Sequence, residues 1–180
     1  MQRFFSAVET FSGKPLVNKN NKLNTYAHLV AESLDTSYFI CLDRNPVFLA
    51  QSLLEASRYI NGDEHIPYGV NFSKDKHAGP EIRIDPVAQV CNQVRRYREI
   101  SFKQEQLIGK GRFYIVPYED FCADPAKWVC RISEEILGKA LDIKDLRKEL
   151  QPFSLSNHVR IEQDSFAKIK NAFESKLDAK

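Results

Sequence analysis

The chain has 180 residues, with 26 Lys and Arg against 24 Asp and Glu, so its formal net charge at pH 7 is only +2. With 43% hydrophobic and 28% charged residues it can bury a core, which indicates a single globular domain over residues 1–180. Seven Gly and eight Pro exclude the collagen-like and low-complexity classes. The near-zero net charge argues against a protein that coats nucleic acid, and we expect no nucleic-acid partner.

Unbroken apolar stretches in the chain are short. The longest, Tyr38–Leu42 and Phe113–Pro117, fall far below the length that spans a bilayer. The N-terminal segment carries Glu9 and lacks the apolar region of a signal peptide. We therefore expect no transmembrane segment and a cytoplasmic location. The secretory lumen stays open as an alternative if a signal or anchor lies outside these residues.

Three β-rich runs predict strands at Leu16–Asn18, Ser37–Leu42 and Arg112–Val116. Each run is nearly continuous in apolar residues and shows no polar alternation. This pattern is typical of strands that are buried on both faces of a parallel sheet.

Helical patterns lie between and after these strands. At Asn45-Pro46, Asp85-Pro86 and Asp124-Pro125, a capping residue precedes a proline that suits the first helical position. Apolar residues at helical spacing predict further helices over Tyr26–Leu34 and over Phe166–Phe173. The alternation of strands with helices predicts an α/β fold, a parallel sheet flanked by helices.

The connection at residues 61–84 is unusually long, polar and punctuated by Gly and Pro. Connections of this length without periodic structure are uncommon in compact domains and often act as lids or binding loops. Two interpretations stay open, a lid over the substrate and a floppy surface insertion.

The four cysteines form no Cys-x-x-Cys pair, and none has a His at metal-ligand spacing. Their sequence surroundings predict free thiols rather than a disulfide framework. We expect no metal site.

Arg44 and Ser52 form the segment that points most directly to a binding site. A buried strand is expected to end at Leu42, Arg44 follows it, and a helix begins at Asn45-Pro46. The cation would lie beside the unpaired N–H groups and the positive dipole end of that helix. Ser52 is two turns further on, so it shares a helix face with Asn45. The residues predict an anion site; the alternative is a surface salt bridge at Arg44 and an inert Ser52.

This segment resembles the 3′-phosphate-binding motif of the sulfotransferase family, in which a strand runs into Arg-Asp-Pro and a Ser follows eight positions after the Arg. Tyr118-Glu119-Asp120, followed by Asp124-Pro125, is similar to the family's Tyr-Glu-Asp-Leu segment and its next helix. Lys19 resembles the Lys of an upstream Lys-[Thr/Asp/Asn]-Pro segment. The late stretch FSLSNHVRIEQDSFAKI looks like a cofactor-binding loop of several branches. The four matches occur in family order.

The resemblance implies a P-loop-NTPase-like sulfotransferase fold and the sulfuryl donor 3′-phosphoadenosine 5′-phosphosulfate (PAPS), with no metal. Arg44 and Ser52 would bind the 3′-phosphate, and Tyr118 would contact the adenosine. Glu119 and Asp120 would orient the strand–loop junction rather than do chemistry. The late loop would add three residues near the 3′-phosphate or adenosine: Ser156, Asn157 and Arg160.

Lys19 is the catalytic residue that the resemblance implies. Sulfuryl transfer resembles phosphoryl transfer, because charge spreads over equatorial oxygens and the leaving phosphate while an acceptor attacks in line. A Lys at the end of the strand predicted at Leu16–Asn18 would stabilise that charge. Two departures from the family pattern stand out: Asn20-Asn21 replaces the proline, and Arg44-Asn45-Pro46 replaces Arg-Asp-Pro.

The family's 5′-phosphosulfate loop has no counterpart before Lys19. The stretch Phe11–Pro15 does not match it, and Pro15 blocks the helix whose N–H groups would be needed. The acidic base of several branches belongs to the same region, so we assign no base. We expect the domain to be incomplete at the N-terminus, as the C-terminal portion of a longer enzyme. A naturally truncated paralogue is the alternative.

The sequence therefore predicts an enzyme that moves a sulfuryl group from PAPS to a hydroxyl or amine of an unidentified glycan, protein or small molecule. One alternative is a non-catalytic nucleotide- or anion-binding remnant of the same fold. Another is a P-loop kinase relative, although the chain contains no Walker A sequence.

Overall fold

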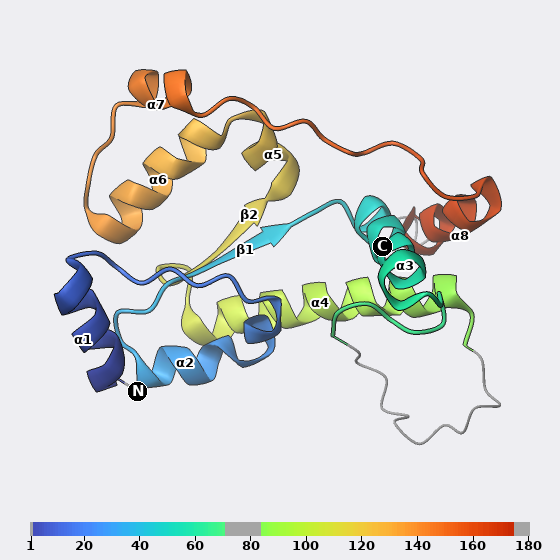
Figure 1. Cartoon of the computed structure of the whole chain (residues 1–180), viewed down its shortest axis with the longest axis horizontal. Coiled ribbons are helices and arrows are strands. Elements are labelled where there is room, and N and C mark those ends of the chain that lie inside the picture. Colours follow the sequence, from blue (N-terminus) through green and yellow to red (C-terminus); the bar gives the residue numbers. More distant parts are fainter. Residues whose placement is uncertain (1, 71–83, 175–180) are drawn as a thin grey trace. The chain divides into compact units, whose positions relative to one another are not determined.

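A computed structural model describes residues 2–70 and 84–174 of the chain (Figure 1). The chain divides into two compact units. Unit 1 comprises Met1–Leu42, Ile100–Val116 and Asp124–Gln151, and unit 2 comprises Asp43–Glu99, Pro117–Ala123 and Pro152–Lys180.

Unit 1 holds a small parallel sheet of two strands, β1 (Phe39–Asp43) and β2 (Phe113–Pro117), each of which ends at the boundary of the unit (Figure 1). The Phe39 N–H donates to the carbonyl of Arg112 at 2.8 Å, and the Phe39 and Phe113 rings stack at 6.0 Å. The helices of this unit are α1 (Gln2–Ser12), the short 3-10 helix η1 (Asn21–Tyr26), α2 (Ala27–Ser33), α6 (Pro125–Leu137), α7 (Ile143–Glu149) and the last part of α4 (Pro86–Ile108). The α/β prediction with a parallel sheet and flanking helices is confirmed at this level.

The strand predicted at Leu16–Asn18 is wrong. This segment is irregular, and the Val17 side chain is 88% exposed. Instead of extending a strand, the chain enters η1, because the Asn20 side chain accepts hydrogen bonds from the backbone N–H groups of Lys22 and Leu23. The short apolar run pairs with neither strand of the described sheet.

The prediction that the strands are buried on both faces fits β2 better than β1. In β2, Phe113 and Val116 are buried at 2% and 1% exposure. In β1 the burial alternates, and Ile40 and Leu42 are about half exposed. The face of β1 that carries these two side chains is therefore only partly covered by the described chain.

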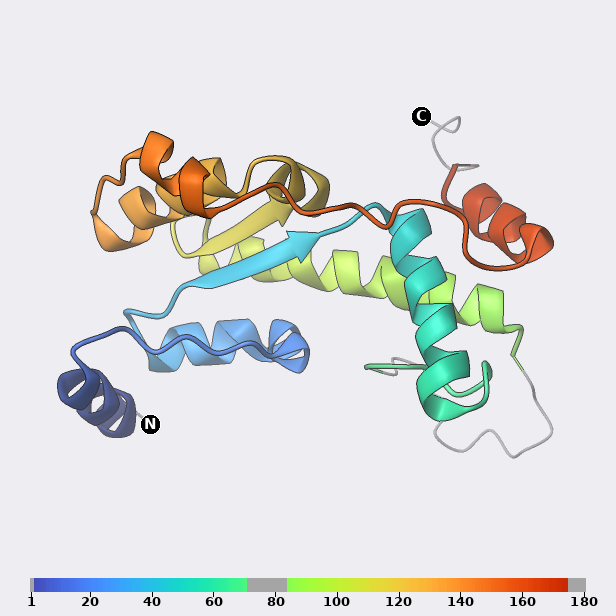
Figure 2. The ribbon, with the colours of Figure 1, turned by 45° about the horizontal axis from the view of Figure 1, so that its top comes forward.

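Unit 2 is a helical unit built from α3 (Pro46–Asn61), the first part of α4, α5 (Tyr118–Ala123) and α8 (Gln163–Glu174). In Figure 2, α3 lies across the first part of α4. Both helices begin where the sequence predicts. The Asn45 side chain accepts from the Val47 N–H at 3.0 Å, and Asp85 accepts from Val87 at 3.3 Å. In unit 1, Asp124 caps α6 in the same way, so all three Pro-containing helix starts are confirmed.

The core of unit 2 lies where α3, α4 and α8 meet. Ala50 and Leu54 of α3 pack against α4 and against Ile169 of α8, and all three are fully buried. The α4 residues of this core share one stripe of the helix: Val87, Val90, Cys91 and Val94.

The first part of the predicted 61–84 loop is anchored. The buried Ser57 hydroxyl accepts from the Tyr68 N–H at 3.0 Å. The Gln93 side chain donates to the carbonyls of Tyr68 and Val70 at 2.7 and 3.0 Å. These hydrogen bonds hold the backbone at residues 68 and 70, and the two interpretations of the 61–84 connection stay predictions. Most of the stretch for which the lid was expected, residues 71–83, lies outside the described residues.

All four cysteines are free thiols, as predicted. Cys91 and Cys122 are buried, and burial raises the pKa of the Cys91 thiol to about 11, which keeps it protonated at neutral pH. No group of three or more His, Cys, Asp or Glu residues within the described ranges could hold a metal ion. The helices that the structure describes include none with both the length and the apolarity to cross a bilayer.

Ile169→Ala tests the core of unit 2. The side chain is fully buried, so its truncation removes apolar contacts and leaves a cavity. We expect the free energy of unfolding to fall by about 2–5 kcal/mol, measured by urea denaturation. Lys168→Ala, on the exposed side of α8, is the matched control and should change it by less than about 0.5 kcal/mol. Equal effects of the two substitutions would contradict this packing.

Candidate functional site

The site begins in unit 2 at the segment between β1 and α3. Asp43, the last residue of β1, forms a bidentate ion pair with Arg98, with N–O distances of 3.1 and 3.0 Å. Its carboxylate is thus engaged with Arg98 and does not neutralise Arg44, the next residue along the chain. Asn45 then caps α3, with Pro46 at its first position.

Arg44 lies at the centre of a cluster of polar side chains. One terminal nitrogen donates to the Ser52 hydroxyl at 3.3 Å. The other donates to the Asn157 side-chain oxygen at 2.9 Å and to the carbonyl and hydroxyl of Ser156 at 3.3 Å. The guanidinium also stacks over the Tyr118 ring, 5.3 Å from its centroid. Four of the residues singled out from the sequence therefore contact a fifth, Arg44.

No carboxylate of the described residues is bound to the positive charge of Arg44. Every hydrogen-bond acceptor around the guanidinium is neutral, and none of the described Asp or Glu side chains forms an ion pair with it. Its Nε atom is buried and has no hydrogen-bond partner among the described residues. A half-buried guanidinium is costly to keep without a counter-charge. The arrangement therefore suits an anionic ligand.

Arg160, the second arginine of the cluster, differs from Arg44 because a carboxylate is bound to it. Its guanidinium binds Glu55 through two nitrogens, at 2.6 to 3.1 Å. It also donates to the Ser52 hydroxyl at 3.0 Å and to the Ser156 carbonyl at 2.8 Å. The hydrogen bond to Glu55 raises the pKa of Arg160 above its ordinary value. The two arginines thus converge on Ser52, and one of them already has a carboxylate partner.

The late loop at residues 156–160 is fixed to α3 by a residue that the sequence analysis missed. Gln51 is fully buried; its side chain donates to the His158 carbonyl and accepts from the Arg160 N–H, both at 3.0 Å. The sequence does contain a hint of this role: Gln51 follows Ala50 and lies one turn before the apolar Leu54. A polar amide next to a core face needs hydrogen-bond partners when it is buried.

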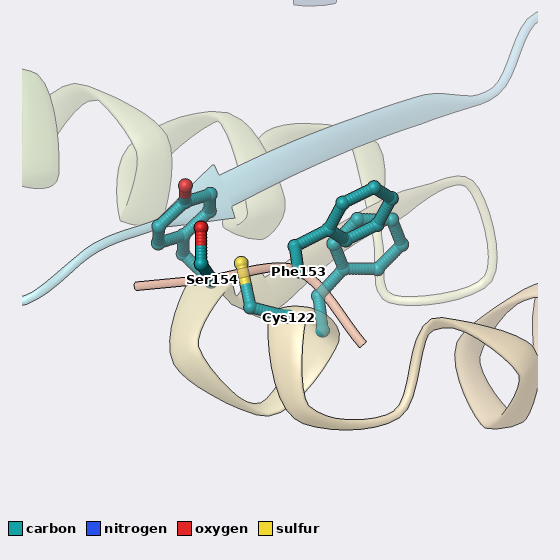
Figure 3. Close-up of a pocket in the computed structure, with 5 residues that line it drawn as sticks. Cys122, Phe153 and Ser154 are labelled. Carbon is teal, nitrogen blue, oxygen red and sulfur yellow. The ribbon is translucent and has the colours of Figure 1, made fainter. Parts of the chain in front are cut away.

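An aromatic hollow of about 380 Å³ lies beside the cluster. It is lined by Tyr118, Phe121, Cys122, Phe153 and Ser154, and Figure 3 shows Cys122, Phe153 and Ser154 around it. The Phe121 and Phe153 rings stack with centroids 5.9 Å apart. A hydrogen bond with Cys122, followed by burial, raises the pKa of Tyr118, so its hydroxyl stays protonated at neutral pH. The hollow offers flat apolar surface next to the Arg44 charge.

A family model described as the sulfotransferase family matches residues 2–138. The chain belongs to the sulfotransferase family. No curated protein and no solved structure matches it. Within the family match lie Lys19, Arg44, Ser52 and Tyr118, whereas the late loop that completes the Arg44 cluster follows it.

Lys19 of this sulfotransferase-family chain belongs to unit 1, whereas the cluster consists only of unit 2 residues. It lies in the irregular segment before η1, not at the end of a strand. The side chain is exposed, and no hydrogen bond or ion pair joins it to another described residue. Within the part of the chain that the structure describes, no contact positions Lys19.

Glu55→Gln tests whether Arg160 is withheld from anions. The substitution removes the carboxylate that occupies Arg160, so we expect inorganic phosphate at constant ionic strength to bind roughly two- to fivefold more tightly. The measurement is the phosphate dependence of the unfolding midpoint. Glu162→Gln is the control, because Glu162 pairs with Arg58 instead and should leave the phosphate response unchanged. A weaker response in Glu55→Gln would show that Glu55 supports the anion site.

Proposed function

We propose that unit 2 binds the 3′-phosphate of PAPS, and that the chain takes part in sulfuryl transfer to a hydroxyl or amine acceptor. The observation that carries this proposal is the uncompensated Arg44 guanidinium, held by neutral side chains against Ser52, Ser156 and Asn157. A phosphate dianion supplies the missing charge and accepts hydrogen bonds from arginine in pairs.

The arrangement around Ser52 favours binding of a phosphate, which has several oxygens, over binding of a monatomic anion such as chloride. The Ser52 hydroxyl accepts from both Arg44 and Arg160, so it can turn its own proton toward a ligand oxygen. The start of α3 adds a positive helix end with Asn45 as its cap. The Arg44 guanidinium, a hydroxyl and a helix end together match the several oxygens of a phosphate.

The adenosine would occupy the aromatic hollow. Tyr118 links the two parts of this site, because its ring lies against Arg44 and its side chain lines the hollow with Phe121 and Phe153. Aromatic rings bind flat bases by stacking, and the protonated Tyr118 hydroxyl can donate a hydrogen bond. This supports a nucleotide 3′-phosphate over an isolated anion.

In the proposed reaction an acceptor oxygen or nitrogen attacks sulfur in line. A bond from the acceptor to sulfur forms, the bond from sulfur to the 5′-phosphate oxygen breaks, and the acceptor proton leaves to a base. Lys19 is the proposed source of positive charge for the leaving phosphate. We propose that the 5′-phosphosulfate loop and the base are supplied by parts of the enzyme outside these 180 residues.

A second candidate function is binding of a 3′-phosphonucleotide without transfer. The observation that favours it is the exposed Lys19, which no described residue positions. Adenosine 3′,5′-bisphosphate would then bind at Arg44, and no acceptor would be sulfated by the complete natural protein. Transfer of labelled sulfate from PAPS by that protein would exclude this candidate.

Arg44→Ala tests the proposed function. Isothermal titration calorimetry with adenosine 3′,5′-bisphosphate should show affinity reduced at least about tenfold, because charge-assisted hydrogen bonds to the 3′-phosphate are lost. Ser52→Ala should cost less, about three- to tenfold. Arg58→Ala is the matched control: this arginine also belongs to α3, pairs with Glu64 and Glu162, and should leave the affinity unchanged. Unchanged affinity in Arg44→Ala would refute the site.

A further inference from the structure

Glu119 connects three segments of unit 2 that are distant in sequence. Its Oε1 accepts from the Asn45 N–H at 3.0 Å and from the Asn157 side-chain amide at 3.2 Å. Glu119 itself lies in the first turn of α5, where an acidic residue is favoured by the helix dipole. One carboxylate oxygen therefore ties α5 to the start of α3 and to the late loop.

The Asn157 side chain carries this connection on to Arg44. Its amide group donates to Glu119, and its oxygen accepts from Arg44 at 2.9 Å. The reverse orientation would place the amide protons against the guanidinium and the oxygen against the carboxylate, which opposes like groups at both ends. Glu119 thereby fixes which end of Asn157 faces Arg44.

The charge of Glu119 cannot be what the anion site needs. A carboxylate that is joined to Arg44 through a single side chain, Asn157, repels a bound phosphate, since like charges disfavour each other more strongly away from bulk water. Glu119 also forms no ion pair with Arg44, so the positive charge of Arg44 is not neutralised by this carboxylate. What Glu119 contributes is an acceptor atom at a fixed position.

We propose that Glu119 is a positioning residue for the 3′-phosphate site: it orients Asn157, which holds the Arg44 guanidinium toward Ser52. The proposal rests on the proposed function, because it assumes that the ligand of Arg44 is a nucleotide 3′-phosphate. It assigns Glu119 a role through hydrogen-bond geometry, not through charge.

The test uses calorimetry on the full chain with two ligands, adenosine 3′,5′-bisphosphate and adenosine 5′-monophosphate, which lacks the 3′-phosphate. Glu119→Ala should reduce the preference for the bisphosphate about tenfold while leaving the affinity for the monophosphate nearly unchanged. Glu119→Gln keeps the acceptor oxygen and loses the charge, so it should retain the wild-type preference or increase it. Asp120→Ala, which removes the exposed neighbouring carboxylate, is the matched control and should behave as wild type.

Asn157→Ala adds a second readout. If Glu119 acts through Asn157, Glu119→Ala should have little further effect on the preference in the Asn157→Ala background. Additive losses would overturn the proposal. So would an equal loss of preference in Glu119→Gln and Glu119→Ala, or a parallel loss of affinity for both ligands, which would indicate general disruption.

The outcomes also separate this proposal from the proposed function. If the wild-type chain binds both ligands equally, the 3′-phosphate site is refuted and the role of Glu119 falls with it. If the wild type prefers the bisphosphate and Glu119→Ala keeps that preference in full, only the role of Glu119 is overturned. A selective loss in Glu119→Ala with rescue by Glu119→Gln supports both.

Discussion

The Arg44 guanidinium is held in a half-buried position by neutral partners, and the rest of the site follows from that constraint. Its neighbours accept hydrogen bonds from its two terminal nitrogens through hydroxyl, carbonyl and amide oxygens but do not neutralise its charge. The carboxylates closest in sequence or space are used elsewhere: Asp43 by Arg98, and Glu119 by Asn45 and Asn157. Because an unpaired charge away from bulk water is costly, a fold that keeps one is well suited to bind an anion there.

Helix α3 is the element that makes this possible. Ala50 and Leu54 bury one face of the helix in the core with α4 and α8. Beside this face the helix carries polar residues that bind the late loop or its arginine: Gln51, Ser52 and Glu55. Gln51 and Glu55 are four residues apart, so they lie one turn apart on the same face. The packing of unit 2 thus fixes the helix, and the helix fixes the loop that completes the Arg44 cluster.

Much of this site could be predicted from the sequence, because its signals are local. A capping residue followed by proline marks a helix start within two residues, and all three such starts are correct. The eight-residue spacing of Arg44 and Ser52 spans a strand end and two helical turns, and the two side chains do meet. The role that the resemblance implies for them stays a prediction.

What the sequence could not show depends on partners far away in the chain. The pairing of Arg160 with Glu55 spans 105 residues and that of Asn157 with Glu119 spans 38, and neither leaves a local pattern. Helices α5 and α7 have only six and seven residues, too few for a clear period. The strand expected at Leu16–Asn18 fails for a related reason: a short apolar run becomes a strand only when another strand pairs with it.

A crystal structure of the chain with adenosine 3′,5′-bisphosphate would test the central claim most directly. The account predicts oxygens of the 3′-phosphate within hydrogen-bond distance of the Arg44 guanidinium and the Ser52 hydroxyl, with Arg44 still held by Asn157. A 3′-phosphate bound away from these residues, with the Arg44 contacts to Ser52, Ser156 and Asn157 unchanged, would contradict it.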